Sequence, residues 1–383
     1  MFSWVIISCC VAVMLFAIVS GVVFLRTIRK IGFLVAGDVA EVSPRIDVVV
    51  PARDEAADLE STIRGLLAQE DVELKILIVN DHSSDATPTI ADRLAAEDSR
   101  ISVLHNPPLQ PGWFGKVNAM QQGANQSSAP DLLFCDADSK MKPRCLITAY
   151  RKREQAKAAL ISLCPLWVCE SFWENALLPH CFVIGTVRFM PPSINEDGSP
   201  HAVAAGAFIL LKREVFNAVG GFEGVKTEML DDVEFARYLK SNGYRTRFQL
   251  APELLTVRLF KNNVDAFWGL RKNIRGSVRS KAMVLPAVLF PVVFFGTPLL
   301  CLGWGMSQQS WSLIVLGLLA YATQLGMTGL ATRLCQIHWR KAIFFPLSVL
   351  PLTCCYMSAL YLWWFRGAVA WRGRVITAKP SSE

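Results

Sequence analysis

Two aspartates separated by one small residue, Asp136 and Asp138, follow an apolar run in the stretch DLLFCDADSK. The leucines and phenylalanine before them are typical of a buried strand. If that strand continued through both aspartates, their side chains would lie on the same face of the sheet. Carboxylates that close repel each other unless a cation lies between them, and such a pair can bind Mg²⁺ or Mn²⁺ through its oxygens. The alternative is a solvated turn, because Asp and Ser favour turns.

The segments before this motif repeat one plan, a strand followed by a polar loop and a helix. The stretch RIDVVVPARDEAADLESTIRGLLAQ predicts a strand over 46–50, and LKILIVNDHSSDATPTIADRLAAE repeats the arrangement. RISVLHN and DLLFCDAD predict a third and a fourth strand. Strands that alternate with helices predict right-handed crossovers and a mainly parallel sheet, with ligands beyond the carboxyl ends of the strands.

The loops at those carboxyl ends, PARDE, NDHSSD and DADS, are mostly acidic, and the loop NPPLQPGWFGKVNAMQQGA adds Lys116 at the start of a helix. Acidic loops with one lysine bind an anion poorly unless a divalent cation joins them and brings in a diphosphate. Neither GxGxxG after the first strand nor GxxxxGK[ST] is present, which disfavours a dinucleotide or P-loop site.

Apolar residues make up 52% of the 383 residues, and four uncharged stretches are long enough to cross a bilayer: 4–25, 283–306, 311–332 and 342–365. The first lacks the basic start and the cleavage site of a signal peptide. The predicted organisation is a transmembrane anchor over 1–25, a linker over 26–44, a globular domain over 45–280, the three later spans and a basic tail over 366–383.

Basic residues predict how these spans are oriented. Arg26, Arg29 and Lys30 follow the first span, and the positive-inside rule then places the globular domain in the cytoplasm. The basic cluster over 271–281 agrees. The tail FRGAVAWRGR disagrees, because three carboxyl-terminal spans would put it outside. A proline-interrupted segment is therefore a candidate for re-entering the membrane rather than crossing it.

Composition excludes some other classes of protein. The eleven cysteines show neither a disulfide framework nor zinc-site spacing, and a cytoplasmic domain is expected to keep its thiols reduced. The formal charge of +7 suits an anionic membrane surface, and no basic-aromatic pattern predicts binding to nucleic acid.

The order of these motifs resembles the family 2 glycosyltransferases of GT-A fold. Six pieces over roughly 45–250, about half the chain, carry the resemblance: VVVPARDEAADLESTI, ILIVNDHSSDAT, GWFGKVNAM, LLFCDADS, AAGAFILLKREVFNAVGGFEG and LDDVEFARYLKSNGYR. The GWFGK loop and the flanking spans are most similar to the branch that glycosylates isoprenoid lipids, such as hopanoids and carotenoids. The resemblance implies an α/β fold, a Rossmann-like GT-A domain with one amino-terminal and about three carboxyl-terminal transmembrane helices.

The resemblance also implies roles at the donor end of the site. Pro51, Ala52 and Glu55 would line the nucleoside pocket, and Asp81 would contact the base or ribose. For Asp81 the alternative is a turn or helix cap, a role that Asp85 could fill equally well.

His82 stands where many relatives carry Gly, which leaves the shape of that loop open, and we assign it no chemistry. Lys116 would approach the phosphates, since a merely solvated lysine at a helix start would oppose the helix dipole. Asp138 would bind the metal directly, and Asp136 would reach the ribose, or the metal through water.

The stretch EMLDDVEFARYLKSNGYR predicts a helix that opens with two acids. By resemblance Asp232 is the catalytic base that takes the proton from the acceptor hydroxyl, as a direct inverting displacement requires. Asp231 stands where Glu is usual, so the assignment is ambiguous by one residue. The alternative is that both acids only stabilise the start of the helix. In FWGLRKNIRGS only Arg271 matches the Gln-x-x-Arg-Trp of processive relatives; it would reach the diphosphate or simply flank the membrane.

The segment 163–192 is rich in aromatic and apolar residues. We expect an interfacial helix with Trp167, Phe172 and Trp173 at headgroup depth and with Arg188 near anionic lipid, the alternative being a core helix.

The function predicted is that of a membrane-bound inverting glycosyltransferase. It would use Mg²⁺ or Mn²⁺ to move a sugar from a nucleotide-diphosphate sugar to a lipid hydroxyl or carboxyl at the cytoplasmic membrane. The alternatives are a nucleotidyltransferase of similar chemistry and a non-catalytic membrane scaffold or transporter. The absence of charged residues from the spans disfavours a coupled transporter.

Overall fold

The computed structural model describes residues 2–37, 43–260, 262–277, 284–334, 336, 339–365, 368–371 and 374–377. The chain divides into two compact units. The first, called the sheet unit here, comprises Ile28–Trp167 and Pro192–Arg258. The second, called the apolar unit, comprises Met1–Thr27, Val168–Pro191 and Leu259–Glu383. The segment around 168–191 and the residues after 258 thus group with the transmembrane candidates rather than with the sheet.

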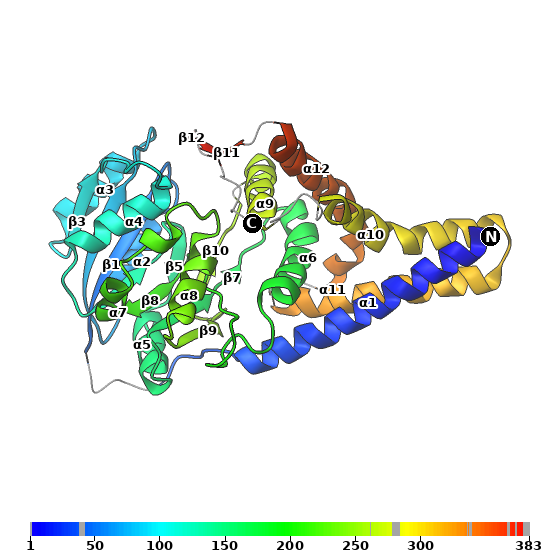
Figure 1. Cartoon of the computed structure of the whole chain (residues 1–383), viewed down its shortest axis with the longest axis horizontal. Coiled ribbons are helices and arrows are strands. Elements are labelled where there is room, and N and C mark those ends of the chain that lie inside the picture. The colour runs from blue at the N-terminus through cyan, green and yellow to red at the C-terminus, as the bar shows by residue number, and fades with distance from the viewer. Residues whose placement is uncertain are drawn as a thin grey trace. The chain divides into compact units, whose positions relative to one another are not determined.

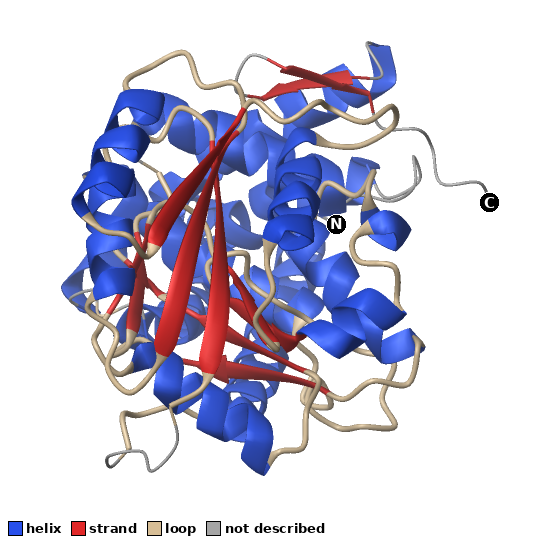
Figure 2. Cartoon of the chain, turned by 90° about the vertical axis from the view of Figure 1, so that its left-hand side faces the viewer, coloured by secondary structure: helices blue, strands red, loops and turns tan. Residues whose placement is uncertain are grey.

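A mainly parallel sheet forms the centre of the sheet unit (Figure 2). In the described residues its seven strands lie in the order β3 (Ile101–His105), β2 (Glu73–Asn80), β1 (Arg45–Ala52), β4 (Asp131–Phe134), β8 (Ile209–Lys212), β6 (Leu160–Cys164) and β9 (Thr246–Leu250). The first four are parallel, β8 runs antiparallel to both of its neighbours, and β6 is parallel to β9. The predicted sheet is confirmed.

Helices follow the strands as the alternating pattern predicts. They are α2 (Leu59–Leu67), α3 (Thr87–Glu97), α4 (Gly115–Gln126), α5 (Cys145–Gln155), α7 (Arg213–Ala218), the 3-10 turn η1 (Glu223–Val225) and α8 (Asp231–Ser241). The helices α4, α7 and α8 share one core with the sheet, which contains Leu132 and Phe134 of β4 together with Phe216 and Phe235, and the Phe134 and Phe216 ring centres lie 5.6 Å apart. Leu132 and Phe134 lie two residues apart, so both point to the face that these helices cover.

A second, small sheet continues directly from the acidic motif. It consists of β5 (Ser139–Met141), β10 (Leu255–Val257) and β7 (Leu166–Trp167), with β5 antiparallel and β7 parallel to β10. Because β5 begins right after Asp138, its pairing with β10 fixes the carboxyl side of the turn that carries the two aspartates.

The apolar unit is helical (Figure 1). Its elements are α1 (Phe2–Ile31), α6 (Phe172–Phe189), α9 (Asn263–Ser277), α10 (Val284–Ser307), α11 (Trp311–Leu334), the 3-10 segment η3 (Trp339–Ser348), α12 (Val349–Phe365) and a hairpin of β11 (Ala368–Trp371) and β12 (Arg374–Thr377). Among the described residues three helical segments are long and apolar enough to cross a membrane: Phe2–Ile31, Leu289–Ser307 and Trp311–Leu334.

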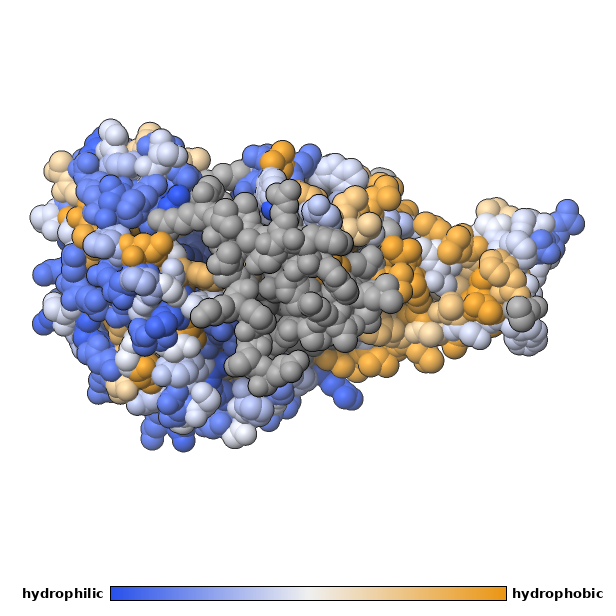
Figure 3. Space-filling model, turned by 45° about the horizontal axis from the view of Figure 1, so that its top comes forward, coloured by the Kyte–Doolittle hydropathy of each residue, from blue (hydrophilic) through white to orange (hydrophobic). Residues whose placement is uncertain are grey.

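These three helices pack against one another and turn apolar side chains outward. Ile6 and Cys10 of α1 share a core with Cys301 of α10 and with Leu313 and Ala320 of α11. Figure 3 shows the apolar side chains gathered over this part of the chain. Exposed apolar side chains on long helices match the demands of a bilayer rather than of water.

The predicted span over 342–365 is not one continuous helix. Its first part lies in η3, which contains Pro346, and the rest forms α12 of 17 residues. Proline removes a backbone donor and interrupts an α-helix. At about 1.5 Å per residue α12 reaches ~25 Å, less than the ~30 Å of a hydrocarbon core. In the described residues this predicted span is therefore not one long helix, unlike the other three.

The aromatic-rich segment 163–192 also divides. Trp167 lies in β7 of the sheet unit, whereas Phe172 and Trp173 open α6, so the three side chains do not share one helix. A capping box starts α6, in which Ser171 Oγ accepts from the Glu174 backbone N–H and Glu174 Oε2 accepts from that of Ser171. The helix packs on α11 and η3 and leaves Phe172 and Trp173 49% and 37% exposed. The side chain of Arg188 lies outside the described residues.

Candidate active site

Asp136 and Asp138 lie in a turn rather than on a strand. Strand β4 ends at Phe134, and the Asp136 backbone N–H donates to Gly206 O at 3.1 Å. The Ser139 N–H donates to Asp136 O at 3.2 Å and closes the turn. The strand alternation expected from the sequence therefore does not hold here, and the turn, braced by Gly206 and by β5, holds the two carboxylates instead.

Lys116, at the start of α4, contacts the turn that carries Asp136 and Asp138. Its Nζ lies 2.6 Å from Asp136 Oδ1 and 3.8 Å from Asp231 Oδ2. Burial opposes the charged ammonium, but the carboxylates of Asp136, Asp231 and Asp232 outweigh it, and the pKa of Lys116 lies above its usual value. Lys116 is thus a fixed cation among three acids, and its unfavourable place at a helix start is offset by their charge.

Asp231 and Asp232 both belong to the site, from the first turn of α8. The Asp231 carboxylate points to Lys116, whereas Asp232 Oδ2 accepts from the Gly206 N–H at 2.9 Å and Oδ1 from the Val233 N–H at 2.8 Å. Burial and the neighbouring Asp231 raise the pKa of Asp232 to about 6, against the opposing effect of Lys116. A carboxyl with such a pKa is ionised near neutrality and can accept a proton.

Gly206, in the AAGAF motif, links the two acidic segments and had no role in the sequence analysis. It accepts from the Asp136 N–H and donates to Asp232. A Cβ at this position would lie 2.8 Å from Asp136 Oδ2 and 2.9 Å from Lys116 Nζ. Only a residue without a side chain allows both groups to approach the backbone here. A glycine three residues before the first residue of the buried strand β8 was the signal available in the sequence.

The side chains of Asp136 and Asp138 fit a divalent cation whose remaining ligands come from substrate phosphate and water. Burial, and then the carboxylates of Asp136 and Glu55, raise the pKa of Asp138 to about 7. A cation beside Asp136 and Asp138 would relieve that repulsion. No group of three or more His, Cys, Asp or Glu side chains with metal-binding geometry occurs in the described chain. Two carboxylates completed by substrate phosphate and water are the usual ligand set of Mg²⁺.

The residues predicted to line a nucleoside pocket lie at the ends of β1 and β2. Pro51 and Ala52 end β1, and Ala52 O accepts from the Asp81 N–H at 2.8 Å. Glu55 is buried, and its backbone N–H donates to Thr87 Oγ1 at 2.8 Å. These hydrogen bonds join the loops after β1 and β2 into one rigid edge.

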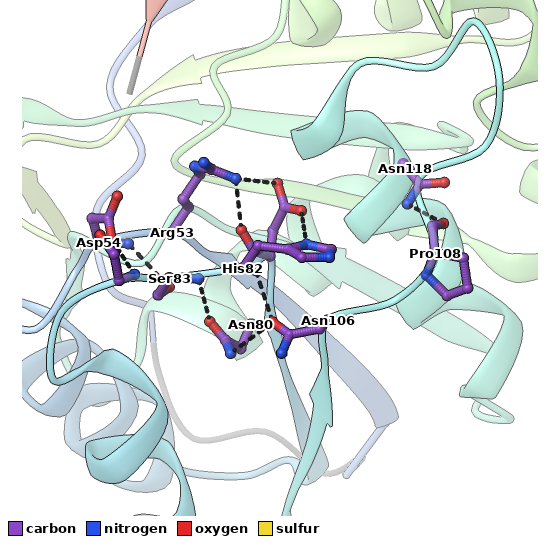
Figure 4. Close-up of polar contacts among 10 residues, drawn as sticks. Arg53, Asp54, Asn80, His82, Ser83, Asn106, Pro108 and Asn118 are labelled. Atoms are coloured by element: carbon purple, nitrogen blue, oxygen red, sulfur yellow. Dashed lines mark hydrogen bonds and ion pairs between the residues drawn. The ribbon is translucent and has the colours of Figure 1, made fainter. Parts of the chain in front are cut away.

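Asp81 is buried and contacts the side chains of Arg53 and His82, which Figure 4 labels. Its Oδ1 lies 3.2 Å from His82 Nδ1, and its Oδ2 lies 3.9 Å from Arg53 Nη1, which also donates to Asp81 O. Asp85 instead accepts from the N–H groups of Ala56 and Thr87, so it has the bracing role that was the alternative for Asp81. Arg53 and His82 are contacts that sequence reasoning missed.

The backbone at His82 has a conformation that glycine favours, in line with the glycine that the resemblance implies at this position. Its φ is +58°, the left-handed region that glycine enters without strain. Asn106 Oδ1 accepts from the His82 N–H at 3.0 Å, and Asn80 Oδ1 accepts from the Ser83 N–H at 3.1 Å (Figure 4). The loop thus keeps the turn that a glycine would make and adds an imidazole beside Asp81.

The loop that leads to Lys116 is braced from α4. The buried Asn118 donates to Pro108 O at 3.1 Å, and its Oδ1 accepts from the Gln110 N–H (Figure 4). The Phe114 N–H donates to Lys226 O at 2.9 Å. These contacts hold the GWFGK segment, and with it the start of α4.

Arg271, the remaining predicted site residue, belongs to the apolar unit. It lies on α9, is buried, and makes its described contacts with Trp268, Phe267 and Ser358. The site residues that the structure brings together are therefore those of the sheet unit.

Known proteins with similar sequences and structures are transferases. A family model described as glycosyl transferase family 21 matches residues 9–382. A 4,4'-diaponeurosporenoate glycosyltransferase of Staphylococcus aureus is 23% identical over 341 residues, which cover 86% of this chain and 87% of that protein. A mannosyltransferase from Pyrobaculum calidifontis, solved with GDP-Man and Mn²⁺, superimposes with a TM-score of 0.54 at 16% identity, covering 92% of this chain and 99% of that one. The structural likeness confirms the predicted fold.

Proposed function

The chain belongs to glycosyl transferase family 21 and is a glycosyltransferase of GT-A fold, and we propose that it glycosylates an isoprenoid-type lipid at the cytoplasmic membrane. The donor in this proposal is a nucleoside-diphosphate sugar, and the anomeric centre is inverted. The observation that carries the proposal is the cluster of Lys116, Asp136, Asp231 and Asp232 around the Gly206 backbone.

We assign the donor end of the site to the hydrogen-bonded loops that follow β1 and β2. Pro51, Ala52 and Glu55 would enclose the nucleoside, and Asp81 would accept a hydrogen bond from the base or ribose. Arg53 and His82 hold the Asp81 carboxylate on both sides, which fixes its orientation before the donor arrives.

The phosphates would then lie near Lys116. The ammonium is a compact positive charge for a diphosphate, and its raised pKa keeps it charged throughout the neutral range. Asp138, with Asp136, would hold Mg²⁺ or Mn²⁺, which when bound neutralises negative charge on the leaving diphosphate. The Mn²⁺ and GDP-Man in the Pyrobaculum structure support a divalent cation and a nucleotide-sugar donor in this proposal.

The acceptor end is assigned to Asp232. Its pKa of about 6 leaves the carboxylate ionised at neutral pH, so it can take the proton from an attacking hydroxyl. The Gly206 and Val233 N–H groups donate to the two carboxylate oxygens of Asp232 and fix its orientation, while the Asp231 carboxylate contacts Lys116. The acceptor oxygen that loses its proton to Asp232 would attack the anomeric carbon from the side opposite the leaving diphosphate, which inverts the configuration.

The lipid acceptor and the membrane location rest on the apolar unit and on the relative. Three helical segments of the described chain could span a membrane, and the Staphylococcus relative is named for glycosylating diaponeurosporenoate. The basic residues after α1 and over 271–281 support a sheet unit on the cytoplasmic side.

The test uses the purified full-length protein in neutral detergent, supplied with a panel of nucleotide sugars, Mn²⁺ or Mg²⁺ and isoprenoid lipids bearing a hydroxyl or a carboxyl. The expected products are a glycosylated lipid and a nucleoside diphosphate. Asp138→Asn should remove nearly all turnover, and so should excess chelator.

Release of inorganic diphosphate from a nucleoside triphosphate would instead identify the rival nucleotidyltransferase. Full activity in chelator would contradict the metal assignment, and efficient transfer to a fully water-soluble acceptor would contradict the lipid assignment.

A further inference from the structure

Arg271 is a buried cation without a carboxylate partner among the described residues. The residue is 5% exposed, on a helix of the apolar unit. Other shielded arginines of the chain are paired: Arg153, 1% exposed, lies 2.6 Å from Asp131 Oδ1, and Arg213 lies 3.5 Å from Asp47 Oδ2. The fold thus supplies counter-ions to those guanidinium groups but, in the part that the structure describes, not to this one.

The contacts of Arg271 leave one edge of its guanidinium unused. Nη1 donates to Ser358 Oγ of α12 at 3.3 Å, and the group stacks 3.7 Å from the centre of the Trp268 ring. Nε is buried and has no hydrogen-bond partner in the described chain. Nε and Nη2 form the edge that grips a carboxylate through two parallel hydrogen bonds.

A buried charge that lacks a counter-ion disfavours the folded state strongly. Burial accordingly holds the pKa of Arg271 below its usual value. An ionisable group within the membrane-associated part of a protein commonly marks a ligand or ion site. The unused edge of the guanidinium, and the lack of a counter-ion for it in the described part of the chain, are what a site for an external anion would show.

We propose that Arg271 anchors a binding site for a lipid-borne carboxylate. One carboxylate balances one guanidinium, and the flat Trp268 ring holds the guanidinium plane in place for a planar partner. The Phe267 ring, whose centre lies 6.0 Å from the guanidinium carbon, adds an apolar surface that suits a hydrocarbon chain. The site differs from the diphosphate contact expected from the sequence, and it does not rest on the proposed transfer reaction.

The experiment measures binding of palmitic acid, its methyl ester and hexadecyl phosphate to the full-length protein in neutral detergent at pH 8, by the shift in thermal unfolding midpoint across a concentration series. The acid should bind the wild-type protein at least tenfold more tightly than the ester does. Arg271→Gln should remove that preference, and Arg271→Lys should weaken acid binding, because a lysine keeps the charge but not the two-bond edge. Arg333→Gln, at an exposed position of α11, is the matched control and should bind the acid as the wild type does.

Several results would overturn the proposal. One is equal binding of the acid and the ester by the wild-type protein. This comparison does not depend on whether any variant folds. A second is unchanged acid binding by Arg271→Gln. Equal binding of hexadecyl phosphate would show a phosphate site instead. GDP or UDP with Mn²⁺ should raise the unfolding midpoint equally in wild type and Arg271→Gln. Loss of that stabilisation in the variant would show that Arg271 contacts the diphosphate instead.

Discussion

At the scale of single residues, the chemistry depends on charges held close together by backbone contacts. Lys116 lies within 4 Å of Asp136 and Asp231, whereas Asp232 accepts hydrogen bonds from the Gly206 and Val233 N–H groups. The two neighbouring aspartates of α8 therefore have different partners, and replacing each one is expected to have a different effect.

Asp232→Asn should lower turnover by about 10²–10⁴-fold and change the apparent affinity for the donor little. A general base acts in the transition state, so its loss affects kcat rather than ground-state binding. Steady-state kinetics with varied nucleotide sugar measure both quantities. Asp231→Asn, which removes a partner of Lys116, should mainly raise the KM for the donor. If the two phenotypes were exchanged, the base would be Asp231.

The transfer rate should fall as the pH is lowered through about 6. Burial raises the pKa of Asp232 to about 6, and this carboxylate must be ionised to accept a proton. A pH–rate profile from pH 5 to 9 at saturating metal measures this acidic limb, because bound metal keeps the Asp138 carboxylate ionised. A rate that stays constant down to pH 5 would contradict the assignment of Asp232 as the base.

Gly206→Ala should lower turnover by about 10²-fold, since displacing reacting groups by about 1 Å costs that much. The added methyl group would contact the Asp136 carboxylate and the Lys116 ammonium. Gly198→Ala is the matched control, because a Cβ there meets no atom within 4 Å, and it should keep wild-type activity. Activity of both is measured alongside their thermal unfolding midpoints. A fully active Gly206→Ala would show that the close approach is dispensable.

At the scale of elements, α6 is a helix with two faces. Leu177, Leu178, Phe182 and Val183 are buried, whereas its first turn leaves two large aromatic rings exposed. Exposed aromatic side chains at the start of a helix within an otherwise membrane-associated unit are typical of the interfacial zone.

Phe172→Glu and Trp173→Glu should impair transfer to lipid and spare slow donor hydrolysis in water, because the nucleotide site lies in the sheet unit. Parallel assays of the two activities in lipid vesicles test this. Trp173→Phe keeps an apolar ring and should behave as the wild type does. Equal loss of both activities would show that these rings support the fold rather than contact the membrane.

At the scale of the whole molecule, the break between η3 and α12 bears on the membrane topology. With α1, α10 and α11 crossing and α12 not crossing, the basic tail falls on the same side of the membrane as the sheet unit. That placement removes the conflict with the positive-inside rule that three carboxyl-terminal spans create.

A reporter that is active only in the cytoplasm, fused after residue 383, should therefore be active. The same reporter inserted at residues 308–310, between α10 and α11, should be inactive because that loop lies outside. An inactive carboxyl-terminal fusion would mean that 342–365 crosses the membrane after all.

The sequence by itself predicted the first four strands of the sheet unit, the helices that follow them and the helix that opens with Asp231 and Asp232. Alternating apolar strands and polar loops leave few topologies open, because parallel strands need helical crossovers of one hand. The acidic loops at the strand ends also identified the edge of the sheet that carries the chemistry. The four apolar stretches were visible because a bilayer demands length and hydrophobicity, which composition records directly.

Only the tertiary structure decided the contacts among distant segments. That Gly206 joins Asp136 to Asp232, and that Asp81 lies between Arg53 and His82, depends on backbone geometry that no local pattern encodes. A turn stands at Asp136 and Asp138 in place of the expected strand. The Asp136 N–H donates to Gly206 O and the Ser139 N–H donates to Asp136 O, so the backbone here does not continue the ladder of β4. Likewise, Trp167 and Trp173 are close in sequence but belong to different units, since a short strand pairs with β10 while the helix after it packs on α11 and η3. Sequence periodicity reports which residues are buried, but packing between segments far apart in the chain decides what they are buried against.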